Sequence, residues 1–322
     1  SSGLPAIVQQ TPLSDTATVE LVLTSPAKDG EQPPELGGLG TIVRSGRPID
    51  LPALLDQALA TWRGPAASIE PTSEDPEERL QQLIADQIHR RSAEPPRPLA
   101  VIVSGKLDPV QAFAAIERKF GSIRPGEIDD RGSRPRGPDI VRERIAKPLA
   151  QGGIGYVVEG PPSGTREAVA WRMLLYILTH DYSGRLGRSA ITEKGLVYHI
   201  YSMLRTNGRQ SWATISTGVD PDKADAMERE LRSQLSRLVS DPPTAAEINA
   251  ARNYLLGRDL TAAQSNDEIT AKLALEFVES SGLRSHERLQ AMLLTVTSAD
   301  LANAAKAFQH GAIIRVDVGA KP

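Results

Sequence analysis

Two kinds of hydrophobic pattern alternate along the chain and predict a mixture of strands and helices. Residues 15–24 alternate apolar with polar positions, as a half-buried strand does, and residues 99–104 form an apolar run (LAVIVS) that predicts a central strand. Residues 77–91 repeat apolar positions every three or four residues, which predicts an amphipathic helix. A further helix is predicted after Asp108, because Asp is a good N-cap and a proline follows it at the first helical position.

The second half of the chain is richer in helical patterns. Residues 168–179 are apolar on nearly every side, which predicts a buried helix, and residues 222–239 carry an apolar face at helical spacing. Between them, Asn207-Gly208 separates two alternating segments and predicts a β-hairpin, because both residues tolerate positive φ. A strand at residues 312–318 completes the pattern.

A helix, a short polar break and a strand follow one another twice, at residues 77–105 and again at residues 297–319. This weak repeat predicts an α+β fold of two related domains, residues 1–130 and residues 131–322, of which the first is abridged. A polar stretch rich in Gly and Pro at residues 126–138 predicts the linker between them. Because most of the 24 prolines lie in the first domain and this linker, we also expect few long regular elements there.

Composition excludes several classes of protein. The 322 residues include no cysteine, so thiolate metal sites and cysteine nucleophiles are impossible. A formal net charge of −3 provides no basic surface field, and we expect no nucleic-acid partner. No run approaches 18 apolar residues, so we expect no membrane span.

Motifs for metal, phosphate or acyl-transfer chemistry are absent from the sequence. Its five histidines are scattered, and neither HExxH nor HxxEH occurs. The Gly-rich segments lack the spacing of a phosphate-binding loop, and there is no GxSxG. His180 follows an apolar helix, where a histidine interacts favourably with the helix dipole. We therefore expect no catalytic residue and no metal ligand in this chain.

One segment carries a denser motif than the rest. Residues 182–202 (YSGRLGRSAITEKGLVYHIYS) contain S-x-R-L, eight further residues, and then G-L-x-Y at the start of an alternating strand. This arrangement closely resembles the C-terminal half of M16 (pitrilysin/insulinase-like) zinc peptidases. Residues 3–23, 101–121, 244–257 and 295–319 resemble further motifs of that family, in the family's order. The resemblance implies two M16-like domains, with helices packed on mostly antiparallel sheets.

The sequence departs from the family where the zinc ligands belong. In active members, an HxxEH helix follows the opening strands, and a distal Glu completes the site. Here no histidine precedes His89, and the first domain is too short to hold the complete catalytic region. Without a metal-activated water, hydrolysis has no nucleophile, so the resemblance implies a chain that is inactive alone. We expect no cofactor in this chain, and zinc in a partner chain.

The second domain of the family also supplies an Arg/Tyr pair that binds the substrate backbone. Tyr198 matches the Tyr, whereas Ile191 occupies the place of the Arg. Arg188 and Lys194 each lie one helical turn from Ile191, so Arg188 is our candidate substitute and Tyr198 our candidate substrate contact. The alternative is structural, with Tyr198 a half-buried strand aromatic and Arg188 a solvated helix residue.

Three functions remain open. The first is a non-catalytic partner subunit that closes a chamber around a peptide against an HxxEH-bearing M16 chain, with peptide addition at an exposed sheet edge. The second is a pseudo-peptidase that binds or assembles without a catalytic partner, for instance as a homodimer. The third is an active metallopeptidase with a rebuilt site. The substrate peptide is not readable from the sequence.

The compartment is also open. A chain that starts at Ser1-Ser2-Gly3, directly on the first domain, is what removal of a signal peptide would leave. The same start would equally suit a chain trimmed at its N-terminus, so the location stays open, with the periplasm slightly favoured over the cytoplasm.

Overall fold

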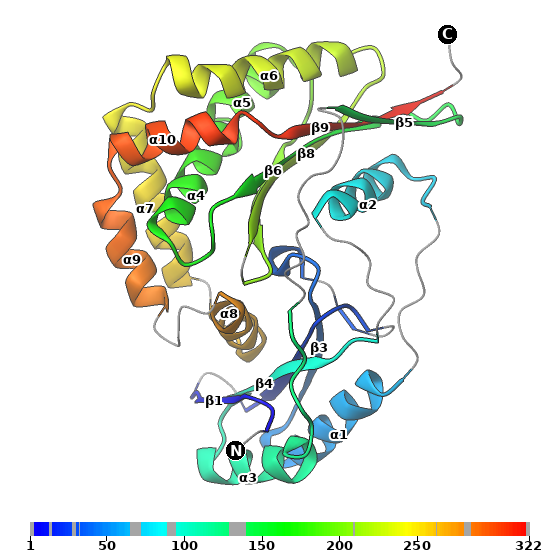
Figure 1. The fold of residues 1–322 in the computed structure, drawn as a ribbon, viewed down its shortest axis with the longest axis vertical. Coiled ribbons are helices and arrows are strands. Elements are labelled where there is room, and N and C mark those ends of the chain that lie inside the picture. The colour runs from blue at the N-terminus through cyan, green and yellow to red at the C-terminus, as the bar shows by residue number, and fades with distance from the viewer. Residues whose placement is uncertain are drawn as a thin grey trace. The chain divides into compact units, whose positions relative to one another are not determined.

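The chain forms two compact units, each assembled from both halves of the sequence. In a computed structural model, placement is described for residues 3–12, 15–27, 30–31, 33–64, 72–88, 95–128, 140–208, 210–261, 263–279 and 285–319. Unit 1 comprises Ser1–Glu70, Arg91–Arg131 and Arg258–His286; unit 2 comprises Pro71–Arg90, Gly132–Gly257 and Glu287–Pro322. Each unit contains one mixed sheet with helices on both faces, which confirms the predicted α+β class (Figure 1).

The sheet of unit 1 has four strands in the order β1-β4-β2-β3. β1 runs parallel to β4, and the other neighbours are antiparallel. The predicted central strand is β4, which is buried along its whole length and therefore has apolar residues on both faces. The strands are β1 (Ala6–Gln10), β2 (Ala17–Leu23), β3 (Gly40–Gly46) and β4 (Pro98–Gly105).

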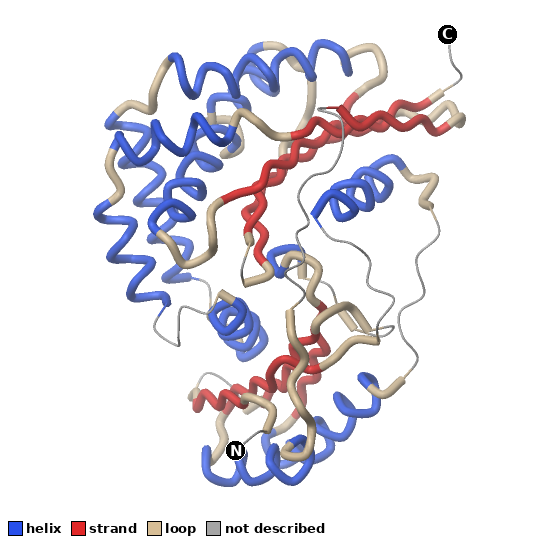
Figure 2. The backbone as a smooth tube through the Cα atoms, in the orientation of Figure 1, coloured by secondary structure: helices blue, strands red, loops and turns tan. Residues whose placement is uncertain are grey.

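Helices cover both faces of this sheet (Figure 2). α1 (Leu51–Trp62) and α3 (Pro109–Phe120) pack on one face, where Val19 and Val103 meet Leu55 and Phe120. α3 begins where predicted, with the Asp108 carboxylate accepting a hydrogen bond from Gln111 N at 2.9 Å. The opposite face is covered by α8 (Asn266–Val278), together with the 3₁₀ turn η1 (Pro34–Leu36).

The prediction of few long regular elements in the proline-rich part is wrong. α1, α2 and α3 all lie there, and each begins with a proline in its first turn or directly ahead of it. The amide of such a residue has no partner within the helix, so proline is tolerated at these positions. η2 (Pro48–Asp50) leads into α1 in the same way.

The sheet of unit 2 has five strands in the order β5-β9-β6-β8-β7. β5 runs parallel to β9, and the remaining pairs are antiparallel. The predicted hairpin is the pair β7–β8, closed by a hydrogen bond from Asn207 N to Gln210 O at 3.2 Å. The strands are β5 (Ile140–Ile145), β6 (Gly152–Gly160), β7 (Tyr201–Thr206), β8 (Ser211–Val219) and β9 (Ala312–Val318).

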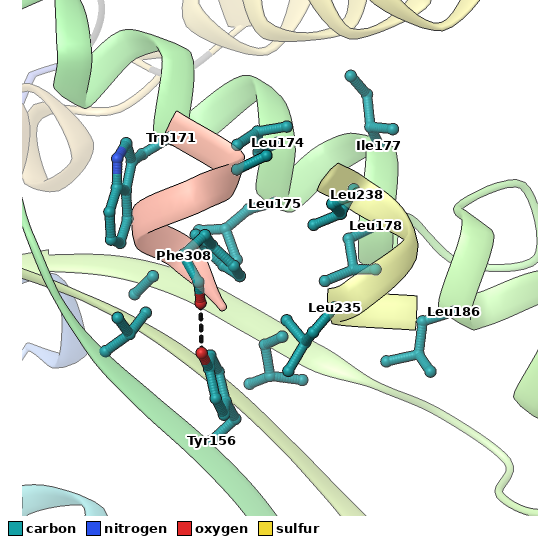
Figure 3. Packing of buried hydrophobic residues seen from close by; sticks show 14 of the residues in the cluster. Tyr156, Trp171, Leu174, Leu175, Ile177, Leu178, Leu186, Leu235, Leu238 and Phe308 are labelled. Carbon is teal, nitrogen blue, oxygen red and sulfur yellow. Dashed lines mark hydrogen bonds between the residues drawn. The ribbon is translucent and has the colours of Figure 1, made fainter. Parts of the chain in front are cut away.

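One face of this sheet holds the largest core (Figure 3). The Tyr156 ring lies beneath Phe308, its hydroxyl donates to Phe308 O, and the rings of Phe308 and Trp171 are 5.0 Å apart. The helices of unit 2 on this side are α4 (Arg166–Thr179), α5 (Arg185–Gly187), the π-helix η3 (Arg188–Glu193), α6 (Ala224–Ser240), α7 (Ala245–Thr261), α9 (Ser285–Thr295) and α10 (Ser298–Phe308).

The opposite face is covered by α2 (Pro76–Ile88), a helix from the first half of the chain. Leu80 and Ile84 of α2 pack against Val157 and Trp212 of the sheet. α2 and α8 are thus exchanged, since each half of the sequence supplies the helix that covers the other sheet. The predicted division into residues 1–130 and residues 131–322 remains a prediction about homologous halves, and residues 129–139, most of the predicted linker, lie outside the described residues.

Pairing identifies corresponding strands in the two sheets. β1 and β5 are the first strands of their sheets, and each pairs in parallel with the last strand of the same sheet, β4 or β9. β2 and β6 are both interior strands. The chain between β6 and β8 forms α4, α5, η3 and β7, whereas the described residues between β2 and β3 form only η1 and an isolated bridge at Glu31. Among the described residues, the first sheet therefore lacks a long helix and an edge strand that the second sheet has. None of the described helices is long and apolar enough to cross a bilayer.

Candidate functional site

Tyr198 lies directly ahead of the edge strand β7. Val197 beside it is buried in the core of unit 2, and the Tyr198 side chain is 72% exposed. The alternative reading of Tyr198 as a half-buried strand aromatic does not describe this position, because the strand begins only at Tyr201. A role as a substrate contact stays a prediction.

Arg188 begins the π-helix η3 and is exposed. Its backbone N–H donates to Gly184 O at 2.7 Å, and its guanidinium has no hydrogen bond or ion pair with the described side chains. η3 is closed by a wide turn in which Lys194 N donates to Ser189 O, five residues back, at 3.1 Å. Because this turn closes over five residues instead of four, a three-residue spacing covers a smaller part of a turn than in an α-helix, and Arg188 and Ile191 are farther apart around the helix axis.

Lys194 is engaged by Glu230, a buried residue of α6. The Glu230 carboxylate also accepts hydrogen bonds from Ser189 Oγ at 2.6 Å and from Gln234 Nε2 at 2.8 Å, and the Lys194 ammonium completes the group. Burial alone would raise the pKa of Glu230, but these three donors hold it below its usual value. Glu230 therefore holds both ends of η3 against α6 and engages Lys194, whereas Arg188 has no partner among the described side chains.

The outer edge of β7 has unpaired backbone groups among the described strands. Because Asn207 and Gln210 form a hydrogen-bonded pair, alternate residues of β7 turn their N–H and C=O groups away from β8. Ser202, Leu204 and Thr206 are these residues. An extended peptide can pair with such an edge through its own backbone.

Side chains of β7 divide between the two faces of the sheet. Ser202 faces the helical core, where its hydroxyl lies 2.5 Å from that of Thr179. On the α2 side, Arg205 donates to Gln81 Oε1 at 3.2 Å, and the rings of His199 and Tyr201 lie 4.7 Å apart. The hollow between these side chains and α2 has room for about one water molecule, so it is no ligand pocket.

The described residues do not fit a zinc site. No three His, Asp or Glu side chains among them gather closely enough to hold a metal. His180 caps the C-terminus of α4, and its ring stacks on Tyr176 at 4.3 Å and lies 4.4 Å from Tyr254. His89 and the side chain of His286 lie outside the described residues.

A family model decides the classification. Residues 95–255, half of the chain, match the family described as peptidase M16 inactive domain. The chain belongs to this M16 family. No curated protein matches it at a significant level.

Solved structures carry the same M16 fold at low sequence identity. A peptidase M16 inactive domain from Pseudomonas fluorescens is 13% identical, with a TM-score of 0.71 over 100% of this chain and 98% of that one. A chain of complex III2 from Candida albicans is 12% identical, with a TM-score of 0.75 over 97% and 93%. The first half of the periplasmic protease PqqL from Escherichia coli is 12% identical, with a TM-score of 0.64 over 98% and 90%. Such identities show the fold alone.

Glu230 of this M16 chain was not among the residues predicted from the sequence. A signal was available, because Glu230 and Gln234 are four residues apart and flank the apolar face of the helix predicted at residues 222–239. Polar residues beside an apolar face are ordinarily exposed, so the pattern alone did not distinguish them. What buries them is η3, which lies far away in the sequence.

Proposed function

We propose that this chain is a non-catalytic subunit of an M16-type peptidase, and that it presents a peptide-binding edge to a zinc-bearing M16 partner. The chain belongs to an inactive-domain family, and this supports the absence of catalysis. The observation that carries the proposal is the missing helix between β2 and β3. In active members this is the place of the HxxEH helix, and without it the described residues offer no ligand set.

The peptide-binding part of the proposal rests on unit 2. Tyr198 is exposed immediately before β7, whose outer edge offers the backbone groups of Ser202 and Leu204. Arg188 of η3 is exposed, and its guanidinium makes no hydrogen bond or ion pair with the side chains that the structure describes. A phenol directly ahead of an open strand edge, and an exposed guanidinium in the same unit, are suited to bind peptide carbonyl groups and a carboxylate.

Reconstitution tests the partnership. The chain is purified alone, mixed with the HxxEH-bearing M16 chain of the same source, and assayed for complex formation and for cleavage of a fluorogenic peptide. We expect a complex, cleavage by the mixture that a chelator abolishes, and no cleavage by this chain alone. Failure to form the complex, or chelator-sensitive cleavage by this chain alone, would contradict the proposal.

Single substitutions test the contacts. Tyr198→Ala and Arg188→Ala are each expected to weaken peptide binding about 5- to 20-fold, the loss of one hydrogen bond to a polar or charged group. Tyr182→Ala is the matched control, because Tyr182 is a tyrosine of the same unit that is 66% exposed. Equal binding by all three variants would remove Tyr198 and Arg188 from the proposed site.

A second candidate function is assembly without a catalytic partner. The M16 fold occurs in a chain of complex III2, so chains of this fold take part in larger assemblies. Sedimentation of the purified chain as a stable homodimer that binds peptide independently of Tyr198 would favour this candidate. We also propose a periplasmic location, which the fold shared with periplasmic PqqL supports, and fractionation of the source cells tests it.

A further inference from the structure

The two exchanged helices are held in chemically different ways. α2 meets its sheet through an apolar contact that includes Leu80, Ile84, Trp212 and Ile314. α8 makes an apolar contact only toward its C-terminal end, where Ala274 and Val278 meet Val22 and Ile102. Its N-terminal part lies on polar side chains. The hydrogen bonds there join Asn266 to Thr11, Thr16 and Ser104, and Asp267 to Thr18 and Ser45.

Glu20 lies within this contact. It is at the centre of β2, opposite Ile102 of β4 and Val43 of β3, and its side chain is 1% exposed. Its Oε2 has no hydrogen-bond partner among the described residues, and the nearby Thr41 hydroxyl is likewise buried and unpartnered. An ionised carboxylate in such a place lacks the donors that would offset the loss of its hydration.

The one hydrogen-bond partner that Glu20 has among the described residues offsets the effect of burial only in part. Glu20 is hydrogen-bonded to Thr270 of α8, and the Thr270 hydroxyl donates its single proton to Asp267 O at 2.9 Å. Because that proton is already used by Asp267 O, the Thr270 hydroxyl stabilises a Glu20 carboxylate only weakly, and it lowers the pKa of Glu20 less than burial raises it. The charged groups that act on Glu20 are Glu31, which bridges to β3, and Asp267 of α8, and both are negative.

We propose that α8 is a pH-sensitive clasp on the sheet of unit 1, closed while Glu20 carries a proton and loosened when Glu20 ionises. Burial, reinforced by Glu31 and Asp267 and partly offset by the Thr270 contact, raises the pKa of Glu20 from 4.5 to about 7. Because the pKa of Glu20 is higher in the closed state, protonation of Glu20 stabilises that state, and this stabilisation is fully present below pH 4.5. That stabilisation declines as pH rises and is lost above about pH 7.

Hydrogen exchange of the full chain, read by mass spectrometry, tests the clasp, and α2 serves as an internal reference. After correction for the intrinsic pH dependence of exchange, opening of α8 is expected to increase on the order of tenfold between pH 5.5 and pH 8.5. α2, which covers its sheet through apolar side chains, is expected to change less than twofold. Equal pH dependence of the two helices would overturn the proposal.

Two variants assign the effect. Glu20→Gln cannot ionise and is expected to keep α8 closed at pH 8.5, whereas Glu35→Gln, at an exposed carboxyl of the same unit, is expected to behave as the parent chain. A Glu20→Gln chain with the parent's pH dependence would overturn the proposal. If Glu20→Gln does not fold, Asp267→Asn replaces it. Removing this negative neighbour should lower the pKa of Glu20 and so shift the opening transition to lower pH, and an unshifted transition would refute the clasp.

Discussion

Arg185 joins two segments of unit 2 through one side chain. Its Nε and Nη2 bind the two oxygens of Glu247 at 2.7 and 2.8 Å, and its Nη1 donates to Asp241 O at 2.6 Å. Glu247 in turn accepts from Thr244 N at 2.8 Å, so it closes the N-terminus of α7 as a capping box. The bidentate Arg185, together with the Thr244 groups and against the effect of burial, lowers the pKa of Glu247 to about 2.

This carboxylate makes unfolding pH-dependent in acid. Because the folded-state pKa lies below the ordinary 4.5, the stabilisation is present above pH 4.5 and is lost as pH falls toward 2. Glu247→Gln is expected to lower the free energy of unfolding by about 1–3 kcal/mol at pH 7, and by less at pH 3.5, in urea titrations. Glu193→Gln, at an exposed carboxyl of the same unit, is the control. If Glu247→Gln lowered the free energy of unfolding equally at both pH values, the low pKa assigned to Glu247 would be contradicted.

α2 approaches the sheet of unit 2 closely because the sheet has glycines beneath it. A Cβ on Gly153 or Gly155 would lie 3.0 Å from a methyl group of Leu80, and one on Gly155 would also lie 3.2 Å from Ile84 Cδ1. Both glycines have ordinary negative φ, so space and not backbone conformation requires them. The absence of side chains at these two glycines thus leaves the space that Leu80 and Ile84 of α2 occupy.

A side chain that fills the space above Gly155 is expected to displace α2. Gly155→Val adds a branched side chain under Leu80 and Ile84, and overpacking of this kind costs about 1–3 kcal/mol of unfolding free energy. Hydrogen exchange of α2 is expected to accelerate while that of α8 stays unchanged. Glu159→Val, at an exposed position of the same strand, is the control. Undisturbed exchange in the Gly155→Val chain would show that α2 does not rest on Gly155.

Patterns along the chain predicted elements well and their partners poorly. The amphipathic helix at residues 77–91 and the hairpin at Asn207-Gly208 are confirmed as α2 and β7–β8. β3 and α1 were missed, since the prolines near them conceal regular structure. An apolar face shows that a helix is buried, but not against which sheet, so the exchange of α2 and α8 was out of reach. The same limit hid Glu230, whose partners come from η3.

At the scale of the whole molecule, the abridged first sheet predicts the metal content of the chain. Purified protein, freed of any tag, is expected to contain far less than one zinc per chain by elemental analysis, because the described residues gather no ligand set. An HxxEH-bearing M16 chain treated in parallel is the control. Near-stoichiometric zinc that survives dialysis would refute this prediction and return the search to His89 and His286.

The exchange of helices also sets an order of events during synthesis. β4, the last strand of the first sheet, is complete at Gly105, whereas α8, which covers that sheet, begins only at Asn266. At ordinary rates of translation the gap is on the order of ten seconds. Throughout it, Val22 and Ile102 have no helix to cover them on the nascent chain. A newly made first half therefore depends on shielding by other factors, and truncated translation products of this protein are prone to aggregate.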